Sequence, residues 1–157
     1  MDRDVLNDAL VSCPGRILNF LSANHVAGLA TTSGDRPWAA SCFYAFDAPT
    51  VALIVMTSER TRHGAAMLAS GWVAGTVAGQ PTSIRSIQGV QFLASAMLLS
   101  GDEAERWGAY YCHRHPVARL KKASLWQLLL QEVVFTDNAH VFGWKTRWLR
   151  PENGSDR

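Results

Sequence analysis

The sequence predicts one mainly antiparallel β domain, a small closed or partly closed barrel with helices at its periphery. Apolar segments with strand character follow one another in hairpin order and are separated by turn signals such as "SGDR" and "DAPT". Helical spacing is confined to the start of the chain and to segments between later strands. The chain has 157 residues, 48% of them apolar, which is enough for one substantial core.

The first half of the chain predicts a helical start followed by three strands. "RDVLNDALVSC" and "GRILNFLSAN" have apolar residues at helical spacing, and Pro14-Gly15 between them predicts one broken helix or two short ones. "HVAGLATT", "PWAASCFYAFD" and the apolar run Val51–Met56 then predict three consecutive antiparallel strands. "RHGAAMLAS" predicts a short helix that Gly71 ends.

The second half alternates strands and helices. "WVAGTVA" and the long "IRSIQGVQFLASAMLLS" predict strands, the latter with Val90 to Leu98 placing alternate residues on one face. Ser100 to Glu103 reads S-x-x-E, a capping-box signature for a helix to about His113, and "VARLKKA" predicts a further helical turn. "LWQLLLQEVVF" fits a helix or a strand by periodicity, but its β-branched pair favours a strand. "HVFGWKTRWL" predicts the final strand.

Composition narrows the class of protein. The net charge of +2 gives no general attraction to nucleic acid. The N-terminus lacks a secretory pattern, and no apolar run reaches the roughly 18–20 residues that span a bilayer. Three widely spaced cysteines indicate reduced thiols. We therefore expect a cytoplasmic protein without a membrane partner, with a single domain over residues 1–150 and a flexible tail over residues 151–157.

The segment "TSERTRH", which follows the run Val51–Met56, is the main candidate site. A strand end followed by a helix start offers free backbone N–H groups and the positive end of the helix dipole. Thr57, Ser58 and Thr61 supply hydroxyls, the Arg62 guanidinium can bind two oxygens, and His63 adds a donor. The pattern fits an anion site, but the spacing alone favours a solvated turn that caps a helix.

Other candidates are weaker. Cys42 is either a nucleophile or a small buried residue, and its apolar neighbours would raise the pKa of its thiol. Cys112, His113 and His115 lie too close together to enclose a metal ion, so we predict no metal site. The basic run 113–122 fits contact with nucleic-acid phosphates or a solvated helical face, and the second is the commoner use.

Several segments together resemble one superfamily. They are "FYAFD", "TRH", "AGTVAGQP", "GVQF", "PVAR", "FTDN" and "FGWKTRWLR". Over nearly the whole chain they resemble the pyridoxamine 5′-phosphate oxidase-like, FMN-binding split barrels, and among these the YhbP-like branch of largely uncharacterised proteins. The resemblance implies a split β-barrel, mainly antiparallel with peripheral helices, a flavin-type site, and a homodimer with the site at its interface.

The resemblance also implies roles for individual residues. In the oxidases a hydroxyl-rich segment ending in Ser-Arg-Lys holds the FMN phosphate, which places Thr57 and Ser58 beside the phosphate. Thr61, Arg62 and His63 then take the Ser, Arg and Lys positions. The flavin ring edge would meet Ser41, Cys42 and Phe43. Further cofactor contacts would come from a strand often supplied by the second subunit and from the C-terminal region: Gln88, Gln91, Trp144, Lys145 and Trp148.

The function implied is that of an FMN-binding flavoprotein, an oxidoreductase acting on an unidentified small molecule. Residues that grip pyridoxamine phosphate are not recognisable, so vitamin B6 synthesis is not implied, and we nominate no catalytic residue. The alternative is a non-catalytic protein that binds haem, a flavin, the deazaflavin F420 or another anion on the same scaffold. For haem, the candidate axial ligands are His63, His113, His115 and His140.

Overall fold

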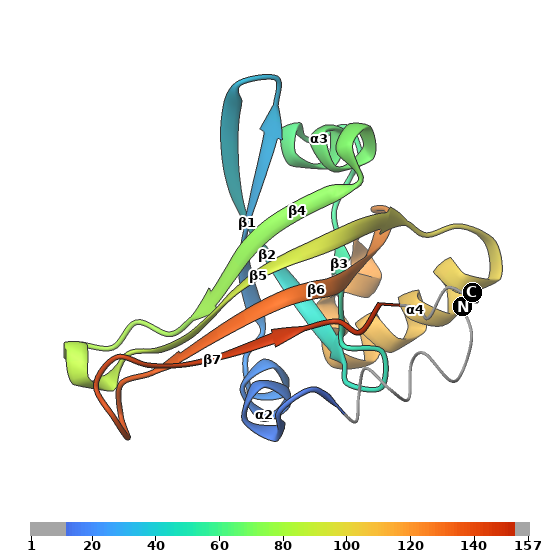
Figure 1. Cartoon of the computed structure of the whole chain (residues 1–157). Coiled ribbons are helices and arrows are strands. Elements are labelled where there is room, and N and C mark those ends of the chain that lie inside the picture. The colour runs from blue at the N-terminus through green and yellow to red at the C-terminus, as the bar shows by residue number, and fades with distance from the viewer. Residues whose placement is uncertain (1–11, 153–157) are drawn as a thin grey trace, which may run out of the picture.

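The computed structural model describes residues 12–152, which form one antiparallel sheet with helices around it (Figure 1). The strands are β1 (Val26–Ser33), β2 (Arg36–Asp47), β3 (Ala52–Met56), β4 (Trp72–Ala78), β5 (Gln88–Leu98), β6 (Leu125–Asp137) and β7 (Trp144–Leu149). The helices are α2 (Gly15–Ala23), α3 (Arg62–Ser70) and α4 (Gly101–Arg114), with 3₁₀ turns η1 (Ile84–Ser86) and η2 (Pro116–Leu120). The prediction of a mainly antiparallel β fold with peripheral helices is confirmed.

The sheet closes into a barrel through its longest strand. The strand order is β3-β2-β1-β4-β5-β6-β7, and an additional pairing joins β3 to β6. The first part of β6, Leu125–Leu129, pairs with β3, while its later part, Glu132–Asp137, pairs with β7. Six strands therefore form the barrel, and β7 extends the sheet beyond the point of closure.

A β-bulge in β6 explains why its sequence pattern was ambiguous. Leu93 of β5 pairs with Glu132, but the next residue, Ala94, pairs with Leu130, so Gln131 has no opposing residue. The extra residue reverses the alternation of sides along β6. Its residues in the main core accordingly change from even to odd numbers: Trp126, Leu128, Leu130, then Val133 and Phe135. Neither strict strand nor strict helix spacing survives across such a break.

The helices cover different parts of the barrel (Figure 1). Ile17 and Leu21 of α2, and Met67 of α3, belong to the main core inside the barrel. The helix α4 lies outside, where Tyr111 packs with Ile54 of β3 in a second buried cluster. The helix α3 lies beside the β1–β2 hairpin, as Figure 1 shows, and Gly71 ends it in a left-handed conformation, as predicted.

One strand edge is left open, and this edge positions the candidate site. The strand β2 pairs with β1 from Arg36 to Phe43, but it pairs with β3 only from Tyr44 to Asp47. On the β3 side, the first eight residues of β2 therefore have no partner strand in the described part of the chain. Their outward backbone groups are available to a ligand or to another chain.

Three details of the sequence prediction need correction. Ser100 stands at the N-cap of α4, but its side chain makes no capping hydrogen bond. The strand β5 begins at Gln88, because Ser83 caps the 3₁₀ turn η1. The last strand begins only at Trp144. Within the described residues no helix is long and apolar enough to cross a membrane.

The two ends of the sequence prediction fall largely outside the described residues. Most of the first helical segment, residues 1–11, and the end of the predicted tail, residues 153–157, are not described. Arg150, immediately before that tail, is anchored in the structure. Its guanidinium donates to the backbone carbonyls of Leu130, Thr50 and Val51 at 2.7–3.1 Å.

Candidate functional site: an anion cradle beside an aromatic pocket

The segment Thr57–His63, called the cradle below, lies where β3 ends and α3 begins. Its first residue is fixed at both backbone groups: the Thr57 N–H donates to the Ser124 carbonyl at 2.9 Å, and the Trp126 indole donates to the Thr57 carbonyl at 2.9 Å. Both partners lie at or near the start of β6. Barrel closure by β6 therefore holds the start of the segment in place.

Thr61 caps α3 and gives the segment its turn. Its hydroxyl accepts a hydrogen bond from the Gly64 N–H at 3.0 Å and donates its own hydrogen to the Ser58 carbonyl at 2.8 Å. The N–H of Ala65 donates to the Thr61 carbonyl at 2.9 Å. In the first turn of α3 the N–H groups of Arg62 and His63 are then without a partner within the helix, because no helical carbonyl can reach them.

His63 turns its imidazole back into the segment. Its Nε2 lies 2.7 Å from the Thr57 hydroxyl, 3.2 Å from the Thr61 hydroxyl and 4.0 Å from the Cys42 sulfur. Because Thr61 uses its hydrogen on Ser58, it can only accept from His63, which places the imidazole hydrogen on Nε2. Burial lowers the pKa of His63, so the imidazole is neutral near pH 7.

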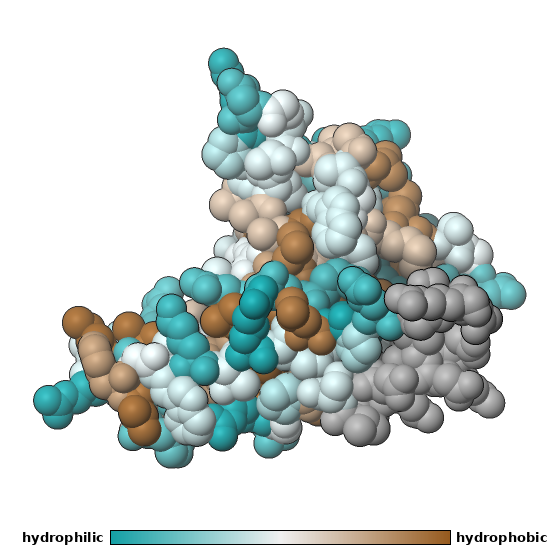
Figure 2. Space-filling view, in the orientation of Figure 1, coloured by the Kyte–Doolittle hydropathy of each residue, from teal (hydrophilic) through white to brown (hydrophobic). Residues whose placement is uncertain are grey.

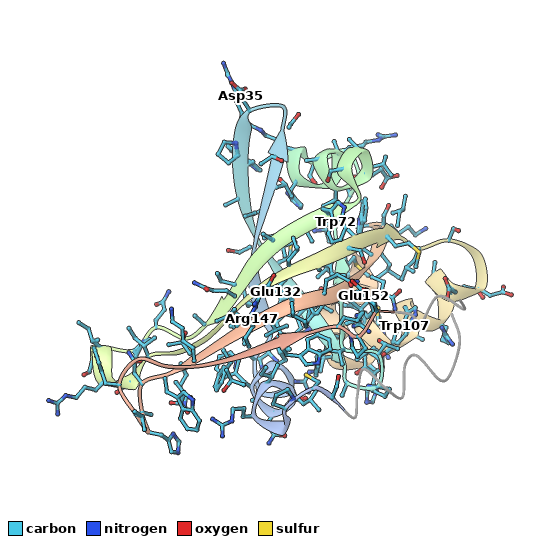
Figure 3. The ribbon with its side chains drawn as sticks, in the orientation of Figure 1. Asp35, Trp72, Trp107, Glu132, Arg147 and Glu152 are labelled. Atoms are coloured by element: carbon cyan, nitrogen blue, oxygen red, sulfur yellow. The ribbon has the colours of Figure 1, made fainter. Side chains whose placement is uncertain are left out.

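Charge at the site comes from Arg62. Its guanidinium carbon lies 4.3 Å from the centroid of the Trp38 ring, a cation–π contact with the β1–β2 hairpin. Two carboxylates of the neighbourhood are directed elsewhere. The Ser124 hydroxyl donates to the Glu59 carboxylate, and Asp35 projects from the tip of the hairpin, away from α3 (Figure 3). The described residues thus give Arg62 no ion pair.

A pocket of about 550 Å³ lies beside this segment. It is lined by Ser41, Cys42, Phe43, Met56, Tyr111, Arg114, His115, Pro116, Val117, Ala118 and Lys121. The three predicted ring-edge residues, 41–43, therefore share one pocket wall on β2. The opposite wall comes from α4 and η2, and sequence reasoning did not assign it to the site. The basic run 113–122 was the available signal, but it was interpreted as a surface for nucleic-acid phosphates or a solvated helical face, and its histidines only as candidate haem ligands.

Cys42 is not activated as a nucleophile. It is buried, and burial raises the pKa of its thiol, an effect that the positive charge of Lys121 partly opposes. The neighbouring His63 is held by hydroxyl groups and is itself neutral, so the pair is a thiol and an imidazole rather than an ion pair. These features favour the interpretation of Cys42 as a small buried residue.

The other predicted cofactor residues form a second group, remote from the first. The strand β4 starts directly after α3, and its last residue, Ala78, pairs with Gly89 at the start of β5. Gln88 therefore lies a full strand length, roughly 23 Å, from the α3 end of β4. Gln88 donates to Asp137 at 3.1 Å, and Asp137 pairs with Trp144. Gln91 and Lys145 lie on the same end of the sheet.

Trp148, the remaining predicted contact, is buried, and its indole N–H donates to the Ser12 hydroxyl at 3.0 Å. The histidines are also separated. His115 Nε2 lies 2.8 Å from the Tyr44 carbonyl at the pocket, whereas His140 binds Asp137 at the remote end of the sheet. Among residues 12–152 no three metal-ligating side chains gather into a metal site.

A closed antiparallel barrel with one strand edge left open defines a split-barrel fold of the pyridoxamine 5′-phosphate oxidase-like type. Solved structures support this fold. A haem-binding protein from Mycobacterium smegmatis superposes with a TM-score of 0.70 at 18% identity over 92% of this chain and 57% of that chain. A FAD-binding protein from Mesorhizobium loti gives 0.64 at 16% identity over 75% and 87%. At these identities the likeness concerns the fold alone.

A sequence relative places the chain more narrowly. The UPF0306 protein of Serratia proteamaculans (strain 568) is 49% identical over 135 residues, which are 86% of this chain and 94% of that protein. The chain belongs to the UPF0306 family. No family model matches it.

Proposed function

We propose that this protein is an FMN-binding flavoprotein of the YhbP-like branch, an oxidoreductase acting on a small molecule, with its site completed in a homodimer. The observation that carries the proposal is the set of free donors at the end of β3. These donors match the requirements of a phosphate group, and they lie directly beside a pocket and an open strand edge.

The donors that remain after internal hydrogen bonding fit a phosphate. The Thr57 hydroxyl accepts from His63 and keeps its own hydrogen, and the Ser58 hydroxyl accepts from the Arg60 N–H at 3.1 Å and keeps its hydrogen as well. The first-turn N–H groups of α3 and the Arg62 guanidinium add donors at the positive end of the helix dipole. No acidic residue lies in that first turn.

The open edge of β2, which forms one wall of the pocket, fits the flavin ring. A flavin edge carries alternating hydrogen-bond donors and acceptors, which an unpaired strand can match with its own backbone groups. Ser41 to Phe43 lie on this edge and also line the pocket. The phosphate segment and the edge lie next to each other, since Cys42 and His63 approach to 4.0 Å.

His63 makes the proposed site less cationic than that of the oxidases. Burial lowers the pKa of this imidazole, whereas a lysine at the same position would be charged. Two full positive charges then remain in the segment, and we expect Arg62 rather than the exposed Arg60 to meet the phosphate, because Arg62 lies in the first turn of α3. We expect FMN to bind reversibly, and its retention during purification to depend on Arg62.

A second copy of the chain would bring the remote group of residues to the site. One chain cannot place Gln88, Gln91, Trp144 and Lys145 at the cradle, because β4 separates them from α3. The same end of the sheet exposes apolar side chains in two adjacent loops, visible as brown atoms at its tip (Figure 2): Ile84, Ile87, Val141 and Phe142. Phe142 is 73% exposed. Exposed apolar clusters of this kind mark interaction surfaces.

Flavin, when bound, supplies the hydride or electron transfer. The chain's own residues would anchor the phosphate, orient the ring along β2 and exclude water with the apolar wall of η2. No side chain is assigned as an acid or a base for the redox step.

The proposal is tested by adding FMN to the purified protein and following the quenching of flavin fluorescence. Arg62→Ala should weaken binding by about ten- to a hundredfold, the effect of losing a charge-assisted hydrogen-bond pair. Arg60→Ala is the matched control, because Arg60 is exposed in the same turn and only its backbone is used. Absence of FMN binding, or equal affinity of wild type and Arg62→Ala, would contradict the proposal.

The homodimer is tested separately by native mass spectrometry, which reports subunit number and retained ligand together. If the protein is a monomer, and if Trp144→Ala leaves its FMN affinity unchanged, then a second copy of the chain does not contribute to the site. Loss of FMN affinity in Trp144→Ala, with the dimer intact, would support it.

A second candidate is a non-catalytic haem or anion carrier on the same scaffold. One solved neighbour is named as a haem-binding protein, and His115 lines the pocket of this chain. A Soret band that forms on addition of haem and disappears in His115→Ala, but not in His140→Ala, would favour this candidate over the flavoprotein.

A further inference from the structure

The wall of the pocket opposite β2 combines fixed aromatic rings with positive charge. Tyr111, His115 and Lys121 come from α4, from its C-terminal end and from the residue after η2. Phe43 faces them from β2 and is 57% exposed, although it is a large apolar ring. This wall is not needed for the cradle that holds the phosphate in the proposed function.

His115 is held in one orientation. Its Nε2 lies 2.8 Å from the Tyr44 carbonyl, and because a carbonyl only accepts, Nε2 carries a hydrogen. The ring lies 4.9 Å from the Tyr111 ring and 5.5 Å from the Phe43 ring, the latter edge to face. The three rings are inclined to one another, and together they form an aromatic wall that another aromatic ring can contact edge to face or in an offset stack.

Two cations line this pocket, and Lys121 is the one whose ammonium group has no hydrogen-bond or ion-pair partner among residues 12–152. Arg114 also lines the pocket, but its guanidinium donates to the Ser22 carbonyl at 2.9 Å and contacts the His25 ring nitrogen at 3.2 Å. Lys121 forms no ion pair within residues 12–152, and its charge acts on the Cys42 thiol inside the pocket. None of the described lining residues is acidic.

We propose that this pocket binds a small planar aromatic carboxylate, with the ring against Phe43, Tyr111 and His115 and the carboxylate on Lys121. The aromatic rings favour a planar apolar body, and the ammonium group of Lys121, which has no partner of its own in the described residues, favours a negative charge on the ligand. The inference extends the proposed function, because such a molecule would lie beside the flavin ring as its substrate. Its binding test, however, requires no flavin.

The test compares two probes of the same shape, 1-naphthoate and the neutral 1-naphthalenemethanol, by calorimetric titration of the flavin-free protein. Wild type should bind one naphthoate for each chain and bind the alcohol at least about tenfold more weakly, as expected when a charge-assisted hydrogen bond is lost. Lys121→Met should lower naphthoate affinity by a similar factor and remove the difference between the two probes. Phe43→Ala should weaken both probes.

Lys122→Met is the matched control, because Lys122 is the exposed neighbour that does not line the pocket. No naphthoate binding by wild type, equal affinity for both probes, or an equal effect of Lys121→Met and Lys122→Met would overturn the inference.

FMN titrations separate this result from the proposed function. Lys121→Met should leave FMN affinity unchanged, and Arg62→Ala should leave naphthoate affinity unchanged. If naphthoate does not bind while FMN binds normally, only the assignment of the pocket is contradicted. If naphthoate binds as expected while FMN does not bind, only the assignment as a flavoprotein is contradicted.

Discussion

Gly64, the third residue of α3, should not tolerate even a methyl group. A Cβ atom at this position would lie 2.2 Å from the Ser58 carbonyl oxygen and 2.9 Å from both Glu59 Cα and the Thr61 hydroxyl. Two of these atoms belong to the backbone, so no side-chain rotation relieves the contacts. Gly64→Ala must therefore push the segment that precedes α3 away from the helix.

The magnitude follows from three opposing effects. Overpacking of this kind costs about 1–3 kcal/mol, and weakening the Thr61 cap costs about 1 kcal/mol. Replacing glycine by alanine inside a helix returns about 1 kcal/mol. We expect Gly64→Ala to lose about 1–3 kcal/mol of unfolding free energy, with about 2–4 °C in Tm for each kcal/mol in a protein of this size.

Urea denaturation followed by circular dichroism measures this loss. Gly15→Ala, in α2, is the control, because a Cβ there meets nothing within 4 Å. It should be neutral or slightly stabilising. A Gly64→Ala protein as stable as wild type would refute the reasoning, and it would mean that the Thr57–His63 segment is not packed against α3 as described.

Three further predictions concern the same region and the thiols. Thr61→Val should lose about 1 kcal/mol of stability in urea denaturation, while Thr61→Ser should retain it, because only the hydroxyl caps α3. Burial lowers the pKa of folded His63, so the unfolded chain takes up the proton first as pH falls through about 6.5, and stability declines. His63→Gln should lose less stability than wild type between about pH 7 and 5, and an identical loss in urea would contradict this. Burial raises the pKa of Cys13 to about 11, so iodoacetamide at about pH 8 should label the partly exposed Cys112 much faster; faster labelling of Cys13 in mass spectrometry would be the contrary result.

Local signals in the sequence were sufficient for most elements of the fold. The run Val51–Met56 is apolar throughout because β3 is covered on both faces, by the main core and by α4. Gly71 ended its helix where the sequence placed it. The spacing in β6 was ambiguous because the single unpaired residue Gln131 changes which side of the strand faces the core. Such a change depends on the partner strand rather than on local spacing.

The candidate site was predictable only in part, for a similar reason. The order of hydroxyls and Arg62 after a buried strand is a local pattern, and the structure does gather these groups at the start of α3. The inward turn of His63 depends on Thr57 being fixed by Trp126, 69 residues away along the chain. The presence of Lys121 and Phe43 in one pocket depends on how α4 packs, which no local pattern encodes.

The double pairing of β6 has a consequence for the exchange of amide protons with solvent. Along most of its length β6 has β5 on one edge and β3 or β7 on the other, so the amide protons on both of its edges are hydrogen-bonded and exchange only after the pairing on their own side opens. The outward amides of β2 from Arg36 to Phe43 have no such protection from the described strands. Amide exchange should thus be slowest in β6 and fastest along the open edge of β2, the two strands that lie on either side of β3. A ligand bound on β2 would first be detected as slower exchange along that edge.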